Sequence, residues 1–369
     1  MAEKYRVGII GRTDRGNYGH GLDSVWREID RAQVIAVADD DERGRWSARS
    51  RTGAERAYSD YREMLEQEQL DIVAVAPRWM NEHKDMMLAA AEHGCHIYTE
   101  KPFCRDLTEA DEIVAACEMR HLKLAIAHQT RWTPTLDVVK REISKGLIGR
   151  VLEIRGRGKE DARRGGGEDL WVLGSHVLDL MRVFGGDPQT CYATVLENGE
   201  PVTGSHVREG NEGIGPLAGD AINAMYTLPE GATGYFGSHR GTAGDPSRFG
   251  IQVFGSEGVV EFLTGHLAPC HVLRDSSWSP GRSRKEWVPI SSNGVGKPET
   301  LPRTGLHGGN VLAVNDLIDC IGNPEQQPKC SMYDARWTVE MIAGVFESHR
   351  TGGPVTLPLK QRENPLTLL

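Results

Sequence analysis

Apolar runs alternate with helical patterns through the first third of the chain, and no other feature constrains its fold as strongly. The clearest unit lies at 72–103, where the runs IVAVAP and HIYTE flank a helical stretch over 81–93. Short apolar runs between helices are typical of parallel strands that are buried on both faces. Because a parallel strand reaches its neighbour only through a crossover, the alternation predicts a doubly wound α/β sheet of the Rossmann type.

The same pattern places the other elements of the first half. Further strands are expected at 6–11, 33–39, 54–58 and 122–129, and helices at 22–29, from about 43, and at 60–68 and 107–120.

After Gln129 the pattern changes. Short alternating runs between 191 and 288 predict a mostly antiparallel sheet, preceded by a helical stretch at 167–186. The serine-rich stretch 276–304 is expected to be surface loop, and helices at 310–321 and 334–349 close the chain. With 369 residues the chain is long enough for two domains. We expect a dinucleotide-binding domain at 1–127 and a substrate-binding and oligomerisation domain at 128–369, with the C-terminal helix able to pack back on the first.

Composition excludes several classes of partner. The net charge is −9. A protein that binds nucleic acid or an anionic membrane needs a basic surface, so the charge argues against both partners. We expect no signal peptide, because a core-like strand begins within the first residues, and the sequence has no apolar run of membrane-spanning length. Its seven scattered cysteines form no C-x-x-C pair, which favours reduced thiols in a cytoplasmic protein.

The turn after the first strand is a candidate phosphate site. Gly8, Gly11 and Gly16 partly match a dinucleotide fingerprint, and Arg12 and Thr13 lie in the same turn. From Gly11, the pattern G-x-G-x-x-G requires glycine at 13 and 16, so Thr13 breaks it. We expect the amino terminus of the helix at 22–29 and nearby backbone N–H groups to receive a pyrophosphate. The alternative is a glycine-rich turn with no ligand.

The second strand ends in three aspartates, beginning with Asp39. A carboxylate there can accept hydrogen bonds from the adenosine ribose and would repel a 2′-phosphate, which favours NAD over NADP. Asp40 or Asp41 could instead cap the following helix, and Arg12 or Arg43 could accommodate the phosphate of NADP.

Lys101 follows another strand, within the sequence Glu100-Lys101-Pro102. Ligands of open parallel sheets bind at the carboxyl ends of the strands, so this charged pair is predicted to belong to a site. The alternative is an ordinary surface lysine.

With these residues in view, the chain resembles the Gfo/Idh/MocA family of NAD(P)-dependent oxidoreductases. The matching segments span nearly the whole chain in order: GIIG, IAVAD, AP followed by Asn81-Glu82-His83, EKPF, HQTRW, IGRV, GGGEDLWVLGSHVLD, FGSEG and SHRTGGPVTLPL. The resemblance implies a Rossmann domain, a second domain with an open, mostly antiparallel sheet that often mediates dimers or tetramers, and hydride exchange at a hydroxyl-bearing carbon of a sugar or cyclitol.

The resemblance also implies roles for particular residues. Lys101 would touch the nicotinamide ribose and the substrate hydroxyl, His176 would accept the proton, and Arg131 would face the site. A histidine suits proton transfer near neutral pH, and a lysine can stabilise a developing alkoxide. Pro77 and Glu100 complete the expected cofactor set.

Several positions keep two interpretations. His176 could be a core histidine, and His83 could line the cofactor pocket or cap its helix. Trp132 and Trp171 could stack on a sugar or simply fill the core.

Some charged residues also have two possible interpretations. Asp179 could pair with Arg182, and Arg163 with Arg164 could meet an anionic substrate group or be solvated.

One departure from the family stands next to the histidine. The family commonly has Asp or Asn four residues before it, where this chain has Val172; Asp169, Glu168 or Asp161 could replace that group. We expect no metal site, because the acidic residues near His176 lack any known ligand spacing.

Three functions follow from these observations. The first is an NAD(P)-dependent dehydrogenase acting on a sugar, glycoside or cyclitol. The second is a glycoside-cleaving enzyme that retains its NAD and oxidises the sugar only transiently. The third is a sugar or nucleotide sensor without catalysis.

Overall fold

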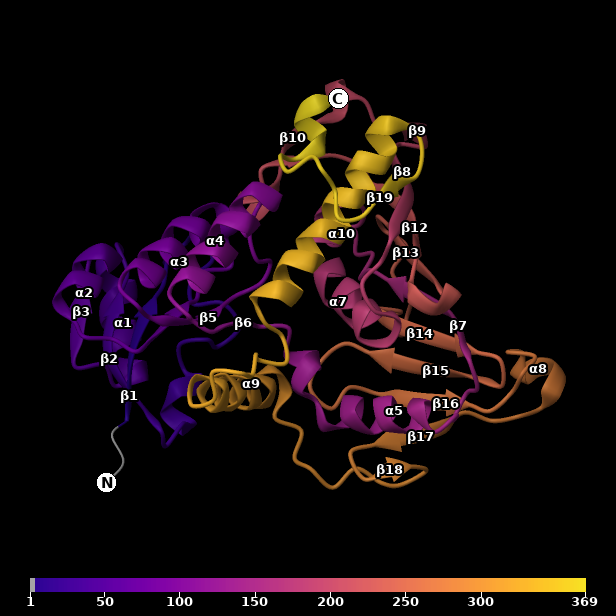
Figure 1. Cartoon of the computed structure of the whole chain (residues 1–369), viewed down its shortest axis with the longest axis horizontal. Coiled ribbons are helices and arrows are strands. Elements are labelled where there is room, and N and C mark those ends of the chain that lie inside the picture. Colours follow the sequence, from indigo (N-terminus) through magenta and orange to yellow (C-terminus); the bar gives the residue numbers. More distant parts are fainter. Residues whose placement is uncertain (1–3) are drawn as a thin grey trace. The chain divides into compact units, whose positions relative to one another are not determined.

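The computed structural model describes residues 4–369 and divides them into two compact units (Figure 1). The first unit comprises the described residues up to 129, with 211–215 and 306–336. The second unit comprises 130–210, 216–305 and 337–369. Each unit is described by itself.

The first unit is built on a six-stranded parallel sheet. Its strands are β1 (Tyr5–Ile10), β2 (Ala32–Ala38), β3 (Arg56–Tyr58), β4 (Ile72–Val75), β5 (His96–Thr99) and β6 (Leu124–Ile126). Their order, β3-β2-β1-β4-β5-β6, is that of a doubly wound dinucleotide-binding sheet, with the order reversing between β1 and β4. The predicted Rossmann fold is confirmed.

Helices α1 to α4 alternate with the strands along the chain, as expected, and further helices of this unit come from later segments (Figure 1). They are α1 (Glu42–Thr52), α2 (Tyr61–Gln67), α3 (His83–Glu92), α4 (Leu107–Met119) and α9 (Gly305–Ile321), with the 3-10 helices η1 (Val25–Glu28), η2 (Met80–Glu82) and η5 (Asn211–Gly213). The helix α10 (Met332–Thr351) and the 3-10 turn η3 (Gln129–Trp132) run from one unit into the other.

The helix predicted at 22–29 is present only in part, as a short 3-10 helix and not as an α-helix. Between β1 and β2 the described chain has only the short 3-10 helix η1. The residues before it are used in turns: Arg12 and Asn17 form an isolated bridge, and Asp14, Gly16 and Asn17 all have positive φ. Gly19 and Gly21, which follow, also have positive φ, a conformation that does not continue into an α-helix. The helix amino terminus that was expected to receive a pyrophosphate is therefore absent from the described loop.

The second unit is built on an eleven-stranded mixed sheet. Its main path is β18-β17-β16-β15-β14-β7-β13-β12-β8-β19, and β9 pairs with β8. The strands are β7 (Val151–Arg157), β8 (Thr190–Glu197), β9 (Glu200–Pro201), β12 (Ala221–Thr227), β13 (Thr233–His239), β14 (Gly250–Gly255), β15 (Gly258–Leu263), β16 (Cys270–Leu273), β17 (Val288–Ser291), β18 (Gly294–Val295) and β19 (Val355–Thr356). A separate pair is formed by β10 (Arg208–Glu209) and β11 (Pro216–Leu217). Within the described sheet only β7 and β13 pair in parallel, so the predicted, mostly antiparallel sheet is confirmed.

The helix α7 lies against one face of this sheet. The helices of the unit are α5 (Pro134–Ser144), α6 (Gly167–Val172), α7 (Gly174–Gly185) and α8 (Pro280–Ser283), with the 3-10 helices η4 (Gly204–His206), η6 (Pro229–Gly231) and η7 (Pro365–Leu368). Val177 of α7 packs on Gly156 of β7, and Met181 packs on Gly234 of β13. Both side chains are buried, and burial of an aliphatic side chain contributes about 1.5–3 kcal/mol. The helix that carries His176 is thus firmly seated.

The stretch 276–304 is more structured than predicted. It contains α8, β17 and β18, and several of its serines donate hydrogen bonds to carboxylates. Asp275 accepts hydrogen bonds from Ser277 Oγ (2.8 Å) and Ser283 Oγ (2.6 Å), and Glu299 accepts from Ser292 Oγ (2.6 Å). The bond from Ser283, with the others around it, lowers the pKa of Asp275 to about 2. Composition indicated a loop because it does not reveal such local caps.

His96, at the start of β5, links stability to pH. Its Nδ1 accepts a hydrogen bond from the backbone N–H of Lys123 (2.9 Å), and burial lowers its pKa to about 4. The unfolded chain therefore binds an extra proton between about pH 6.5 and 4. We expect the contribution of neutral His96 to the free energy of unfolding to be complete above about pH 6.5. It should be lost as the pH falls toward 4.

Each unit of pKa shift corresponds to about 1.4 kcal/mol, so the loss is at most about 3 kcal/mol. Urea unfolding from pH 7 to 4 measures it. The His96→Gln variant should have a flatter profile than the natural protein, and identical slopes would contradict the assignment. The exposed His93 provides the control, as His93→Gln should leave the slope unchanged.

Among residues 4–369, no helix has both the length and the apolarity required to cross a bilayer.

Candidate active site

Lys101 and Glu100 lie directly beyond the carboxyl end of β5 in the first unit. The backbone N–H of Glu100 still pairs with Val75 of β4 (2.9 Å), so the sheet fixes where the pair begins. Glu100 is 0% exposed and Lys101 is 6% exposed, so Lys101 is not an ordinary surface lysine. Burial alone would raise the pKa of Glu100, but the hydrogen bond and charge of His20, together with Lys101, hold it below its usual value. A carboxylate and a lysine are thus held together at the ligand-binding edge of a parallel sheet.

His83 connects two strand ends to each other. Its Nε2 lies 2.7 Å from the carbonyl oxygen of Pro77, beyond β4, and its Nδ1 lies 3.0 Å from the carbonyl oxygen of Pro102. The ring is fully buried. His83 therefore positions the backbone around Lys101, and Pro77 takes part through its carbonyl group.

Asp39, at the end of β2, accepts its hydrogen bonds from the chain itself. Thr13 Oγ1 donates to Asp39 Oδ2 (2.7 Å), and the backbone N–H of Asp41 donates to Oδ1 (3.1 Å). Asp41 is the N-cap of α1 and accepts from the N–H of Gly44 (2.6 Å). The capping role proposed for one of the aspartates therefore belongs to Asp41.

Arg12 and Arg15 bind Asp40, the middle aspartate of the three, and a glutamate beyond β4. Arg12 contacts Asp40 (2.9 Å) and Glu82 (2.6 Å), and Arg15 contacts the same two carboxylates. Partial burial opposes ionisation of Asp40, but the charges of Arg12 and Arg15 outweigh it and lower the pKa of that carboxyl. This four-residue cluster joins the loop after β1 to the ends of β2 and β4.

Packing explains the glycines of β1 and of the loop that follows it. A side chain at Gly8 would collide with Leu70, and one at Gly11 would collide with the ring of Tyr18. Gly16 has φ +93°, and any Cβ there would meet the backbone nitrogen atoms of Arg78 and Trp79. These contacts bring the loop close to the strand ends.

His20 and Asn310 hold this loop in place, and neither was predicted from the sequence. His20 Nδ1 bonds Glu100 Oε1, and the carbonyl of His20 accepts from Asn310 Nδ2 (3.0 Å). Asn310 Oδ1 also accepts from Tyr98 Oη (2.8 Å) and from Gln129 Nε2 (3.1 Å). No local pattern reveals Asn310, because its partners lie far away in the sequence.

His176 lies in the first turn of α7 in the second unit. Its backbone N–H donates to Leu173 (3.2 Å), and its ring meets Phe249 edge to face, with centroids 6.5 Å apart. The side chain is partly exposed, unlike its neighbours Ser175 and Val177. A partly exposed imidazole on a fixed helix can exchange a proton with a ligand.

The two tryptophans singled out by sequence are both in the core. Trp132 is buried, and Trp171 is only 2% exposed. Trp171 Nε1 and Ser175 Oγ are enclosed and have no hydrogen-bond partner among residues 4–369. Burial of this kind leaves little ring face for stacking on a sugar.

Arg131 is paired with Asp179 of α7. Arg131 Nε lies 3.4 Å from Asp179 Oδ2, and both side chains are largely enclosed. Arg182, the partner expected for Asp179, donates to Asp187 (2.7 Å). Asp179 therefore helps to hold Arg131 next to the helix that carries His176.

The loop before α6 is organised by buried carboxylates. Asp169 accepts from the N–H groups of Lys159 (3.2 Å) and Glu160 (3.0 Å) and from Ser238 Oγ (2.5 Å). Burial raises the pKa of Asp169 in spite of these bonds.

Other charged side chains of this loop also have protein partners. Asp161 accepts from the backbone N–H groups of Arg163 and Arg164, and Arg164 lies 3.6 Å from Glu168. Val172 is buried and has no polar side-chain atom with which to orient a substrate.

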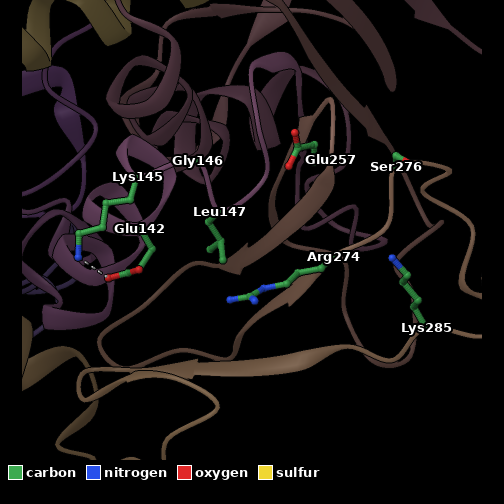
Figure 2. A pocket seen from close by; sticks show the side chains of 8 residues that line it. All are labelled: Glu142, Lys145, Gly146, Leu147, Glu257, Arg274, Ser276 and Lys285. Atoms are coloured by element: carbon green, nitrogen blue, oxygen red, sulfur yellow. Dashed lines mark hydrogen bonds and ion pairs between the residues drawn. The ribbon is translucent and has the colours of Figure 1, made fainter.

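A surface pocket of about 520 Å³ lies elsewhere on the second unit. It is lined by Glu142, Lys145, Gly146, Leu147, Glu257, Arg274, Ser276 and Lys285. Figure 2 shows Lys145 paired with Glu142, at 3.4 Å. None of the predicted site residues lines this pocket.

Comparison with known proteins gives the family. Residues 5–128 match the model of the oxidoreductase family with an NAD-binding Rossmann fold, and residues 137–261 match the GFO/IDH/MocA C-terminal domain.

The chain is 32% identical over 354 residues to D-apiose dehydrogenase of Paraburkholderia graminis, covering 92% of this chain and 87% of that protein. It is 28% identical to myo-inositol 2-dehydrogenase of Thermotoga maritima, over 69% of this chain and 74% of that protein. A levoglucosan dehydrogenase solved with NADH and levoglucosan has the same fold, with a TM-score of 0.76 and 20% identity over 97% of this chain and 100% of that one. The fold, both domain models and the full-length relative agree, and this chain belongs to the Gfo/Idh/MocA family of oxidoreductases.

Proposed function

We propose that this protein is an NAD-dependent dehydrogenase that oxidises a hydroxyl-bearing carbon of a sugar or cyclitol. The observation that carries the proposal is the buried Lys101 beside Glu100 at the ligand edge of a Rossmann sheet. Relatives named as dehydrogenases of D-apiose and myo-inositol support the substrate class. Such substrates carry several hydroxyl groups and no obligatory charge.

The chain supplies two groups that suit alcohol oxidation. Lys101 would donate a hydrogen bond to the substrate hydroxyl and stabilise the alkoxide as it forms, and His176 would accept its proton. Arg131, held by Asp179, would orient another polar group of the substrate. When bound, the nicotinamide supplies the hydride acceptor.

Asp39 supports NAD as the preferred cofactor. The hydroxyl of Thr13 already donates to its carboxylate, so the donor chemistry of the position fits a ribose hydroxyl. Asp40 and Glu82 add negative charge next to it, which disfavours the 2′-phosphate of NADP, although Arg12 and Arg15 offset part of that charge. Gly8, Gly11, Arg12, Thr13, Gly16, Pro77 and His83 would shape the rest of the cofactor edge.

A panel of sugars, cyclitols and glycosides, with NAD⁺ and NADP⁺ in parallel, tests the proposal through absorbance of the reduced cofactor. Net NADH formation supports a dehydrogenase. Cleavage of a glycoside without net NADH would instead support the enzyme with retained cofactor. Ligand binding without turnover, unchanged in Lys101→Ala, would support the sensor.

We also propose that residues 1–127 form the dinucleotide domain and 128–369 the substrate and oligomerisation domain of a cytoplasmic homodimer or homotetramer. Support for assembly comes from the outer sheet face. Tyr192, Met225 and Tyr235 are directly opposite one another on β8, β12 and β13, and each is more than one third exposed. A row of large exposed apolar side chains across adjacent strands is typical of an interface.

Substituting Met225, 39% exposed, by arginine is expected to shift the mass of the protein in light scattering toward the monomer. The reason is that a buried, unpaired charge at an interface costs several kcal/mol. Met119 on α4, 72% exposed, provides the matched control, because Met119→Arg should leave the mass unchanged. A natural protein that is already monomeric at micromolar concentration would contradict the assembly.

A further inference from the structure

The loop after β1, residues 12–21 (the edge loop), lies along the carboxyl edge of the Rossmann sheet. The carbonyl of Gly16 accepts from the N–H of Arg78, beyond β4 (3.2 Å). Gly19 packs so closely on the chain that a Cβ would collide with the carbonyl oxygen of Ala76 and would press tightly on the side chain of Glu100. Dinucleotides bind at this edge in doubly wound sheets. The edge loop therefore lies along the edge at which a cofactor would bind.

Ion pairs and hydrogen bonds hold the edge loop at two places along that edge. Beyond the ends of β2 and β4, Arg12 and Arg15 bind Asp40 and Glu82, respectively the β2 and the β4 partner. At the β5 end, His20 binds the buried Glu100. Anchors at both places make this a defined closed conformation of the loop.

Thr13 makes the contact that matters most for a nucleotide. Its hydroxyl donates to Asp39 Oδ2 at 2.7 Å, and its backbone N–H lies 3.2 Å from both oxygens of the same carboxylate. Asp39 is only 1% exposed. A hydroxyl donating to the carboxylate at the end of β2 has the chemistry of an adenosine ribose hydroxyl. Because Asp39 is enclosed, a ribose can reach it only after Thr13 has moved away.

We propose that Thr13 competes with the adenosine ribose of the cofactor for Asp39, so that the closed edge loop opposes binding of the adenosine half of the nucleotide. The inference rests on the proposed use of NAD. Binding replaces the hydrogen bond of Thr13 by one from the ribose, and the part of the edge loop around Thr13 leaves its closed position. The measured affinity for the nucleotide is therefore the intrinsic affinity reduced by the fraction of molecules that are open.

Calorimetric titration of three ligands tests this competition: NAD⁺, ADP-ribose and nicotinamide mononucleotide. Thr13→Val keeps the shape of the side chain and removes its hydroxyl. It is expected to bind NAD⁺ and ADP-ribose about tenfold more tightly than the natural protein, since a hydrogen bond to a charged group no longer has to be broken. Affinity for nicotinamide mononucleotide, which lacks the adenosine ribose, should stay the same.

Two further variants complete the experiment. Thr13→Ala removes the same hydroxyl and should show the same gain, whereas Thr13→Ser restores it and should bind like the natural protein. Equal or weaker binding of ADP-ribose by both Thr13→Val and Thr13→Ala, with folding verified by circular dichroism, would overturn the competition. That failure is distinct from failure of the proposed function, in which the natural protein and every variant would bind no nucleotide and reduce no NAD⁺.

Discussion

Replacing His176 by asparagine is expected to lower kcat for alcohol oxidation by a factor of about 10² to 10⁴. Asparagine keeps a polar side chain of similar reach but cannot accept a proton near neutral pH. The partly exposed ring is packed edge to face on Phe249, and its helix is seated on β7 and β13, so the substitution should leave the fold intact. Steady-state rates measured between pH 6 and 10 provide the readout.

The pH profile separates a proton acceptor from a structural histidine. In the His176→Asn variant the rate should recover toward high pH, where the alcohol loses its proton more readily without an enzyme base. His121→Asn is a matched control, because His121 is exposed and has a positive φ that asparagine tolerates. A His176→Asn enzyme with an unchanged kcat and pH profile would remove His176 from the chemistry.

Replacing Lys101 by methionine is expected to lower kcat/KM by a factor of about 10³ while nucleotide binding changes little. Methionine fills much of the same buried volume, but it offers neither the hydrogen bond nor the charge that stabilises an alkoxide. Loss of one such group typically lowers kcat by about 10² to 10³, and lost orientation of the substrate adds to this. Steady-state kinetics and calorimetric titration with NAD⁺ measure the two quantities separately.

Lys140→Met on α5 is the control for Lys101→Met, since Lys140 is an exposed lysine with no role in the site. If Lys101→Met lost nucleotide affinity in proportion to its activity, Lys101 would serve the cofactor rather than the reacting hydroxyl. If it kept full activity, Glu100 and Lys101 would be a buried structural pair, and the proposed mechanism would be wrong.

The parallel half of the fold was predictable because its signals are local. Most of the strands are apolar runs of a few residues, and three of the helices begin at a capping aspartate. Asp41, Asp60 and Asp106 accept a hydrogen bond from the first turns of α1, α2 and α4. The helix expected at 22–29 failed for a non-local reason. The glycines before it serve contacts with Arg78, Ala76 and Glu100, which the sequence alone does not bring together.

The site was predictable to a similar extent. Lys101 and Asp39 were found because strand ends can be read from sequence. The partners of these residues could not be found in this way. Thr13 was expected to meet the cofactor, and in the structure it binds Asp39. His20 was missed because its partner Glu100 is 80 residues away. Trp171 was a candidate for stacking on a sugar, and the structure encloses it in the core.

The first unit is assembled from segments far apart in the sequence, and this has a consequence for folding during translation. Asn310 on α9 bonds Tyr98 of β5 and the carbonyl of His20, and Ser331 forms a bridge with Ala125 of β6. Arg336 also donates to Asp111 of α4 (2.6 Å). Chains generally fold in domains as they leave the ribosome, with the amino-terminal domain first. Here the amino-terminal unit lacks these partners until translation has passed residue 336, so the segment that is synthesised first is completed almost last.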